Sequence, residues 1–176
     1  DILNPVSPLQ LEPDERVGVD ALLWDQPWGA LGRISAVHAP QHEDEDGSTA
    51  ARVKRYVAGV DAGLMLGEFA DVTKAGLSGS GSLRGTGWRT ELLWSQPAQG
   101  DSYWQAVADV NWSFRSGINL AVEYFYNGQP VPLQALDLSR LVASEPLYAG
   151  RHYTGVLVWQ DINPFWQYRV VAIRNA

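Results

Sequence analysis

The chain contains no cysteine, and its 176 residues include a single methionine. The absence of cysteine excludes a disulfide framework, thiolate catalysis and cysteine-built zinc sites. No run of about 18 apolar residues is present, which excludes a transmembrane helix. Basic residues are also few, because 13 Lys and Arg stand against 20 Asp and Glu, for a formal net charge of −7. This acidic balance argues against nucleic-acid binding, which needs a basic surface to neutralise phosphates.

Aromatic and turn-forming residues, in contrast, are abundant. The chain has eight Trp, seven Tyr, 17 Gly and 10 Pro. Such a composition suits strands and turns and disfavours helices, so it predicts an all-β protein. The length fits one domain over residues 1–176, or one piece of a larger domain. Residues 1–5 form neither a basic n-region nor an apolar h-region, so any signal peptide lies outside this chain.

The clearest strand signal lies between Tyr103 and Phe114. Apolar residues occupy its even positions, and mainly polar residues occupy its odd positions. This period of two predicts a long strand with one apolar and one polar face. A second such segment, 117–127, follows the turn Arg115–Gly117, so the two predict a hairpin. Similar segments predict about ten strands, the others being 16–24, 29–39, 50–58, 60–70, 73–83, 87–96, 151–162 and 165–175.

The connections between these strands alternate between short and longer. In an up-and-down meander this alternation predicts one end with tight turns and one end with loops, as in outer-membrane barrels. We expect an N-terminal loop over 1–14 and a very long connection over 128–150. Within the latter, apolar spacing over 134–144 indicates a short amphipathic helix, which either constricts a lumen or caps the loop end.

The position of the aromatic residues favours an apolar face turned toward lipid. Small residues occupy the centre of the 103–114 strand, whereas the core of a soluble barrel needs bulk there. Trp104 and Trp112 are ~27 Å apart along the strand, which projects to about 21 Å when tilted, close to the ~25 Å apolar band of membrane barrels. We therefore predict an antiparallel up-and-down transmembrane β-barrel. Its lipid-facing aromatic girdle comprises Trp88, Trp94, Trp104, Trp112, Phe114, Tyr124 and Tyr126.

The opposite strand faces then line the lumen. Because successive side chains of a strand point to opposite faces, alternate positions can be assigned to this lining. The assigned residues are Asp20, Arg33, Arg89, Glu91, Asp109, Asn111, Asn119, Glu123, Gln167 and Arg169. Charges of both signs argue against a pore that strongly selects anions or cations.

Several segments resemble proteobacterial outer-membrane β-barrels of porin type. They are 15–21, the hairpin that joins 110–114 to 123–128, and Gly150–Tyr153 with the hairpin after it. The resemblance spans most of the chain from about Asp14 onward. It implies insertion into the outer membrane and passive diffusion of small solutes. We further expect contact with outer-membrane lipid, small polar solutes as cargo, and either a homo-oligomer or further barrel strands. We expect no cofactor and no catalytic activity.

Two patterns suggest other chemistry. The segment 42–47 reads His-x-Asp-x-Asp-Gly, which resembles the start of a calcium loop, with His42, Asp44 and Asp46 as weak metal candidates. Its twelfth position is Val53, which cannot close the site, so a solvated acidic loop is the favoured interpretation. His38 and His152 accompany no Ser-His-Asp, HExxH or nucleophile-elbow motif, which favours ordinary structural histidines.

Two alternative functions stay open. One is an outer-membrane enzyme of lipase or protease type, which requires a nucleophile and base clustered on the loop side. The other is a soluble β-barrel that binds an apolar ligand. Strand counting also places both ends of the chain at the loop side, which predicts that residues 1–176 form an internal portion of a larger barrel. Pairing of the first strand with the last would contradict that prediction.

Overall fold

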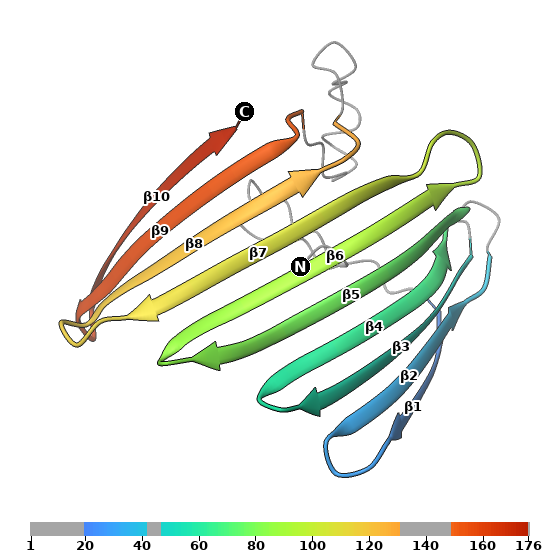
Figure 1. Cartoon of the computed structure of the whole chain (residues 1–176), viewed down its shortest axis with the longest axis horizontal. Coiled ribbons are helices and arrows are strands. Elements are labelled where there is room, and N and C mark those ends of the chain that lie inside the picture. The colour runs from blue at the N-terminus through green and yellow to red at the C-terminus, as the bar shows by residue number, and fades with distance from the viewer. Residues whose placement is uncertain (1–19, 42–46, 131–148, 176) are drawn as a thin grey trace.

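Ten strands form one antiparallel sheet in the computed structural model, which describes residues 20–41, 47–130 and 149–175 (Figure 1). Each strand neighbours the next strand in sequence, so the predicted all-β, up-and-down order is confirmed. The strands are β1 Leu22–Pro27, β2 Gly32–Ala39, β3 Ser48–Val57, β4 Val60–Phe69, β5 Val72–Leu83, β6 Thr86–Pro97, β7 Tyr103–Ser113, β8 Ile118–Asn127, β9 His152–Asn163 and β10 Trp166–Asn175. The described residues include no helix long and apolar enough to cross a membrane.

Three hairpins close with two-residue turns at Ala58–Gly59, Ala70–Asp71 and Arg84–Gly85. All six of these residues have positive φ angles, between 47° and 88°. Positive φ at both central residues gives a turn whose twist matches that of the flanking strands. The predicted alternation of short and longer connections is therefore wrong between β4 and β5, because Ala70–Asp71 makes a turn as tight as its two neighbours.

The first strand also differs from the prediction. β1 continues to Pro27, so residues 25–27, expected in a turn, belong to a strand. The turn that follows is closed by the Trp28 N–H, which donates to the Gly32 carbonyl at 2.8 Å. The segments expected as an N-terminal loop (1–14), a calcium-like loop (42–46) and a short helix (134–144) lie entirely or mostly outside the described residues.

The sheet is curved and open. In Figure 1 the outer strands β1 and β10 turn away from the viewer at opposite ends of the sheet, so the face toward the viewer is convex. Among the described strands, β1 pairs only with β2 and β10 pairs only with β9. These ten strands therefore do not close into a barrel by themselves. The pairing of the first strand with the last, which would contradict the prediction of a larger barrel, is absent from the described strands.

The strands are staggered along the sheet. Each residue can be followed to its direct partner on the next strand. Starting from Gln26, near the turn end of β1, this path arrives at His152, at the loop end of β9. Such a steady offset is what a closed barrel requires, because its strands tilt relative to the barrel axis.

Few side chains of this single layer are buried. The buried residues of the described part are Met65, Leu93, Ser95, Phe125 and Asn127, and all five lie on the concave face by strand parity. A sheet normally buries one face against a second layer of secondary structure. No second layer of helices or strands covers this sheet within the described ranges.

Candidate functional site

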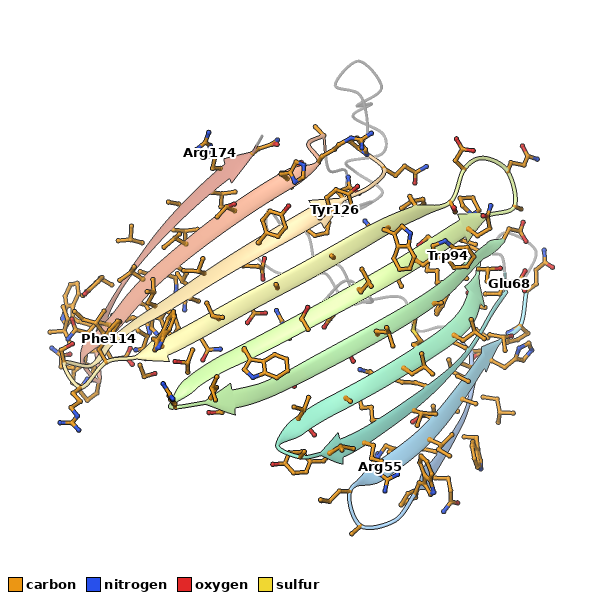
Figure 2. All side chains as sticks on the ribbon, viewed as in Figure 1. Arg55, Glu68, Trp94, Phe114, Tyr126 and Arg174 are labelled. Atoms are coloured by element: carbon orange, nitrogen blue, oxygen red, sulfur yellow. The ribbon has the colours of Figure 1, made fainter. Side chains whose placement is uncertain are left out.

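The two faces of the sheet are defined by strand parity and register. Residues directly opposite each other on neighbouring strands point to the same face. Trp94 is opposite Trp104, and Arg89 is opposite Asp109. Because no register shift interrupts the pairing from β1 to β9, these assignments extend across the sheet. We call the face that carries Trp94 the convex face, and the face that carries Arg89 the concave face (Figure 2).

The convex face is apolar and accessible. Leu64, Leu66 and Leu77 form its centre over β4 and β5, and each exposes more than half of its surface, at 54%, 59% and 56%. Monomeric soluble proteins rarely expose contiguous apolar patches larger than a few hundred Å². This face therefore indicates contact with an apolar partner or medium.

Charge is confined to the margins of the convex face. Its charged strand residues are Arg55, Glu68 and Arg174. Arg55 lies near the turn end of β3 and stacks over the Trp28 ring, 5.2 Å from its centroid. Glu68 and Arg174 are each next to the last residue of their strands, β4 and β10. The central part of this face in the described strands is thus uncharged.

The predicted girdle residues lie together on the convex face. Trp94 and Trp104 form a directly opposed pair near the loop ends of β6 and β7, with Tyr126 near the loop end of β8. Trp88 and Trp112 lie near the turn ends of β6 and β7. Tyr124 is also on this face, whereas Phe114 follows the last residue of β7. The convex side of β2–β5 carries no aromatic residue, whereas β1 and β10 add Trp24 and Tyr168 to this face.

A groove crosses the convex face beside the tryptophan pair. Its volume is about 430 Å³, and its lining is Leu64, Ala75, Gly76, Leu77, Leu92, Trp94 and Trp104. The small Ala75 stands directly between the bulky Leu66 and Trp94 on the neighbouring strands, which leaves the hollow. The groove can therefore take an apolar chain.

The concave face holds most of the charge. Its strands carry six basic residues, Arg33, Arg52, Lys54, Lys74, Arg89 and Arg169, and six acidic residues, Asp25, Asp61, Glu91, Asp109, Glu123 and Asp161. This balance makes the face polar without a net charge from its strands.

A cluster of ion pairs joins three neighbouring strands of the concave face. The Arg89 Nε donates to Asp109 Oδ2 at 2.6 Å, and its Nη2 lies 3.7 Å from Glu123 Oε2. Register explains the cluster, because Arg89, Asp109 and Glu123 are directly opposite one another on β6, β7 and β8. Two adjacent carboxylates would repel each other without the guanidinium between the strands.

A second pair lies at the other end of the sheet. Arg33 Nη1 donates to Asp25 Oδ2 at 2.8 Å, and the Ser35 hydroxyl donates to the other oxygen at 2.6 Å. On β9 and β10, Gln167 Nε2 donates to Asp161 Oδ1 at 2.6 Å. Charged side chains at both ends of the concave face are thus hydrogen-bonded to side chains on the adjacent strand.

Nine of the ten residues expected on the lumen side share the concave face. Asp20 is the exception, since it precedes β1 and lies outside the sheet. The sequence interpretation missed the other charged residues of this face, namely Asp25, Arg52, Lys54, Asp61, Lys74 and Asp161. The alternation of polar and apolar residues along β3 could have placed Arg52 and Lys54 on this face. The adjacent Lys54 and Arg55, which point to opposite faces, interrupt that alternation.

The two described histidines lie apart on the convex face. His38 Nδ1 is 2.8 Å from Thr49 Oγ1, and His152 Nδ1 is 2.7 Å from the Tyr124 hydroxyl oxygen. Neither contacts a carboxylate in a catalytic arrangement within the part of the chain that the structure describes, which also contains no group of three metal-ligating side chains. The weak metal candidates His42, Asp44 and Asp46 lie outside it.

Comparison with known proteins adds no relative, since no family model, no curated protein and no solved structure matches the chain. Interpretation of the two faces therefore depends on their own chemistry.

Proposed function

We propose that the chain forms part of an outer-membrane β-barrel that lets small polar solutes diffuse passively through its lumen. One observation carries this proposal: neighbouring residues of the same strands build an exposed apolar convex face and a charged concave face. A transmembrane barrel needs an outer band that is apolar between aromatic margins, and an interior that is polar. In this arrangement the convex face meets lipid and the concave face meets water.

The open edges support a barrel with more strands than these ten. In hydrocarbon, the unpaired backbone groups of an edge strand have no water to bind, so open sheet edges do not occur there. The curl of the ten strands leaves β1 and β10 at opposite ends of the sheet (Figure 1). We therefore propose that additional antiparallel strands, from elsewhere in a longer chain or from a second copy, complete the barrel.

The mixed charges of the concave face support passage of small polar solutes in general over strong exclusion of one ion type. The ion pairs of Arg89 with Asp109 and Glu123 hold these side chains against the wall, which keeps them out of the path.

A second candidate function is binding of an apolar ligand in water, and the groove beside Trp94 and Trp104 favours it. The two candidates differ in the medium they require. A lipid-facing convex face keeps the protein in detergent or membranes, whereas an apolar-ligand binder stays dissolved without either.

The test is reconstitution of the chain into liposomes and planar bilayers. We expect the protein to float with liposomes after washing at high pH, and to produce discrete conductance steps in bilayers. A monomer that remains in aqueous solution without detergent and does not float with liposomes would contradict the membrane proposal. Flotation without conductance would limit the proposal to a membrane wall that conducts no ions.

A further inference from the structure

Two neighbouring cations of the concave face lack a partner among the described residues. Arg52 and Lys54 of β3 make no ion pair or hydrogen bond with the described residues, whereas Arg33 and Arg89 are paired with carboxylates. Lys74 of β5, the other basic residue nearby, stacks over the Phe69 ring, 5.4 Å from its centroid. Arg169 of β10 contacts only the Gln167 amide oxygen, at 3.5 Å, so β3 is the described strand that carries two concave cations without an ion pair or a hydrogen bond.

The two cations lie close together. They are two residues apart on the same strand face, or ~7 Å along the strand. Lys54 is also directly opposite Arg33 on β2, whose charge is already paired with Asp25. Like charges at such positions repel each other and destabilise the sheet unless an anion neutralises them. The arrangement thus favours an anion from outside the protein.

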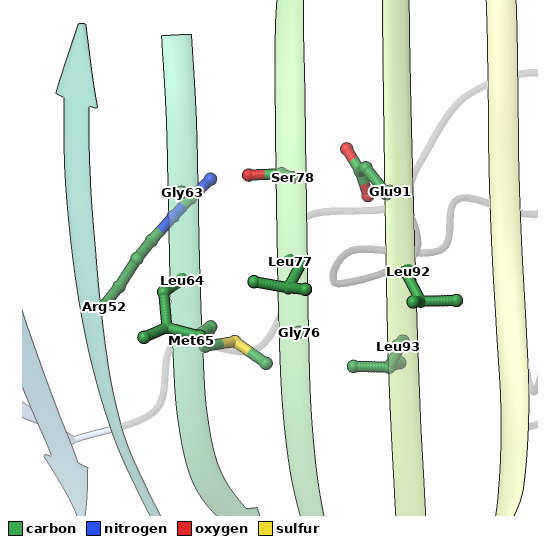
Figure 3. Close-up of a pocket in the computed structure, with 10 residues that line it drawn as sticks. All are labelled: Arg52, Gly63, Leu64, Met65, Gly76, Leu77, Ser78, Glu91, Leu92 and Leu93. Carbon is green, nitrogen blue, oxygen red and sulfur yellow. The ribbon is translucent and has the colours of Figure 1, made fainter. Parts of the chain in front are cut away.

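A small pocket beside these cations can take one oxygen of such an anion, because its volume is about 20 Å³. Its polar lining is Arg52, Ser78 and Glu91, and its floor includes Gly63 and Gly76 (Figure 3). The Arg52 side chain extends across Gly63 toward Ser78 in Figure 3, and the stem of Lys54 also passes close to Gly63. A Cβ at position 63 would lie 2.5 Å from the Ser78 Oγ, so only glycine leaves this space free.

The groups around the pocket match the chemistry of an oxyanion. A guanidinium presents planar N–H donors that bind carboxylate or phosphate in a bidentate manner, an ammonium adds a mobile charge and a hydroxyl adds a further donor. The Glu91 carboxylate lines the far side of the pocket and Asp61 lies on the adjacent strand β4, so these acids confine an anion to the β3 side.

We propose that Arg52, Lys54 and Ser78 form a binding site for small solutes that carry a carboxylate or phosphate group. The proposal deepens the proposed function, on which it rests, because it assumes that the concave face is open to water. Retention at this site makes such anions the preferred class among the solutes that reach the wall.

The direct test is isothermal titration of the purified chain in detergent micelles with inorganic phosphate and, separately, with succinate. The variant carrying Arg52→Gln and Lys54→Gln is compared with Arg169→Gln, which removes a cation from the same face on β10. We expect the double variant to bind at least about tenfold more weakly, equivalent to 1.4 kcal/mol or more, because charge-assisted hydrogen bonds are lost. The control should change affinity less than about twofold. Circular dichroism confirms that all variants fold.

Binding of either anion that the double variant weakens and the control leaves unchanged supports the site, and the anion that binds identifies the solute class. Absence of binding by the unchanged chain, or equal weakening in both variants, would overturn it. The binding test needs no conductance, so failure of the anion site and failure of the membrane channel give different results. Conductance without anion binding would contradict only the proposed anion site. Anion binding by a protein that does not enter liposomes would contradict only the proposed membrane channel.

Discussion

The convex and concave faces of this sheet are built from alternating residues of the same strands, yet they have opposite properties. On β7, Ala108 lies on an uncharged surface bordered by tryptophan, while the adjacent Asp109 takes part in an ion-pair cluster. Apolar side chains remain exposed on the convex face because no second layer covers the sheet in the described ranges. A sheet organised in this way suits two different media, one on each side.

The largest expected effect comes from placing a charge at the centre of the convex face. Ala108 lies between Thr90 and Tyr124 on that face. Ala108→Arg should strongly reduce the fraction of protein that floats with liposomes, because arginine on a lipid-facing strand costs about 2–4 kcal/mol near the bilayer midplane.

The matched variant is Asn111→Arg on the concave side of the same strand. It should enter liposomes normally and change only conductance or ion selectivity. Equal loss of flotation in the two variants would contradict the assignment of the faces.

A smaller effect is expected where glycine allows close packing on the convex face. A Cβ at Gly81 would lie 2.9 Å from the Gly59 carbonyl oxygen and 3.1 Å from the Trp88 ring. Gly81→Ala should therefore lower the free energy of unfolding in micelles by about 1–3 kcal/mol, through strain from overpacking. Urea titration followed by tryptophan fluorescence measures the change.

Gly155→Ala on β9 is the control for that substitution, because a Cβ there has no atom within 4 Å. Its unfolding midpoint should stay equal or rise. If both alanine variants were equally destabilised, loss of glycine itself rather than crowding beside Trp88 would be the cause.

The smallest effect concerns the concave face. Arg89→Gln leaves Asp109 and Glu123 directly opposite each other without their shared cation. Because the Arg89 side chain is 42% exposed, solvent screens the interaction, and we expect a loss of only about 0.5–1 kcal/mol. High salt should reduce the difference from the unchanged chain. A salt-independent loss would point to packing rather than charge.

Local alternation was sufficient to predict much of this fold. In β7 and β8 an apolar side chain follows a polar one with few breaks, so strand, turn and face could be assigned from the sequence. The pattern fails in β5, where Gly79 and Gly81 replace apolar residues on the convex face and the Trp88 ring packs against both. It also could not identify Ala70–Asp71 as a tight turn, since neither residue is glycine and both adopt positive φ.

The site was less predictable than the fold because it depends on register. Arg89 and Asp109 are 20 residues apart in sequence, and only the pairing of β6 with β7 brings them to 2.6 Å. The isolation of Arg52 and Lys54 likewise follows from which side chains lie on β2 and β4. Parity identifies the face of a residue, whereas register identifies its partners.

The most direct test of the account is a nitroxide scan from Ala106 to Asn111 in liposomes. The chain has no cysteine, so each single-cysteine variant carries one label. We predict that labels at the even positions collide mainly with oxygen dissolved in the bilayer, and that labels at the odd positions collide mainly with a water-soluble nickel complex. The two accessibilities should alternate with a period of two residues and opposite phase. Equal exposure of both sets to the nickel complex would contradict the assignment of the convex face to lipid.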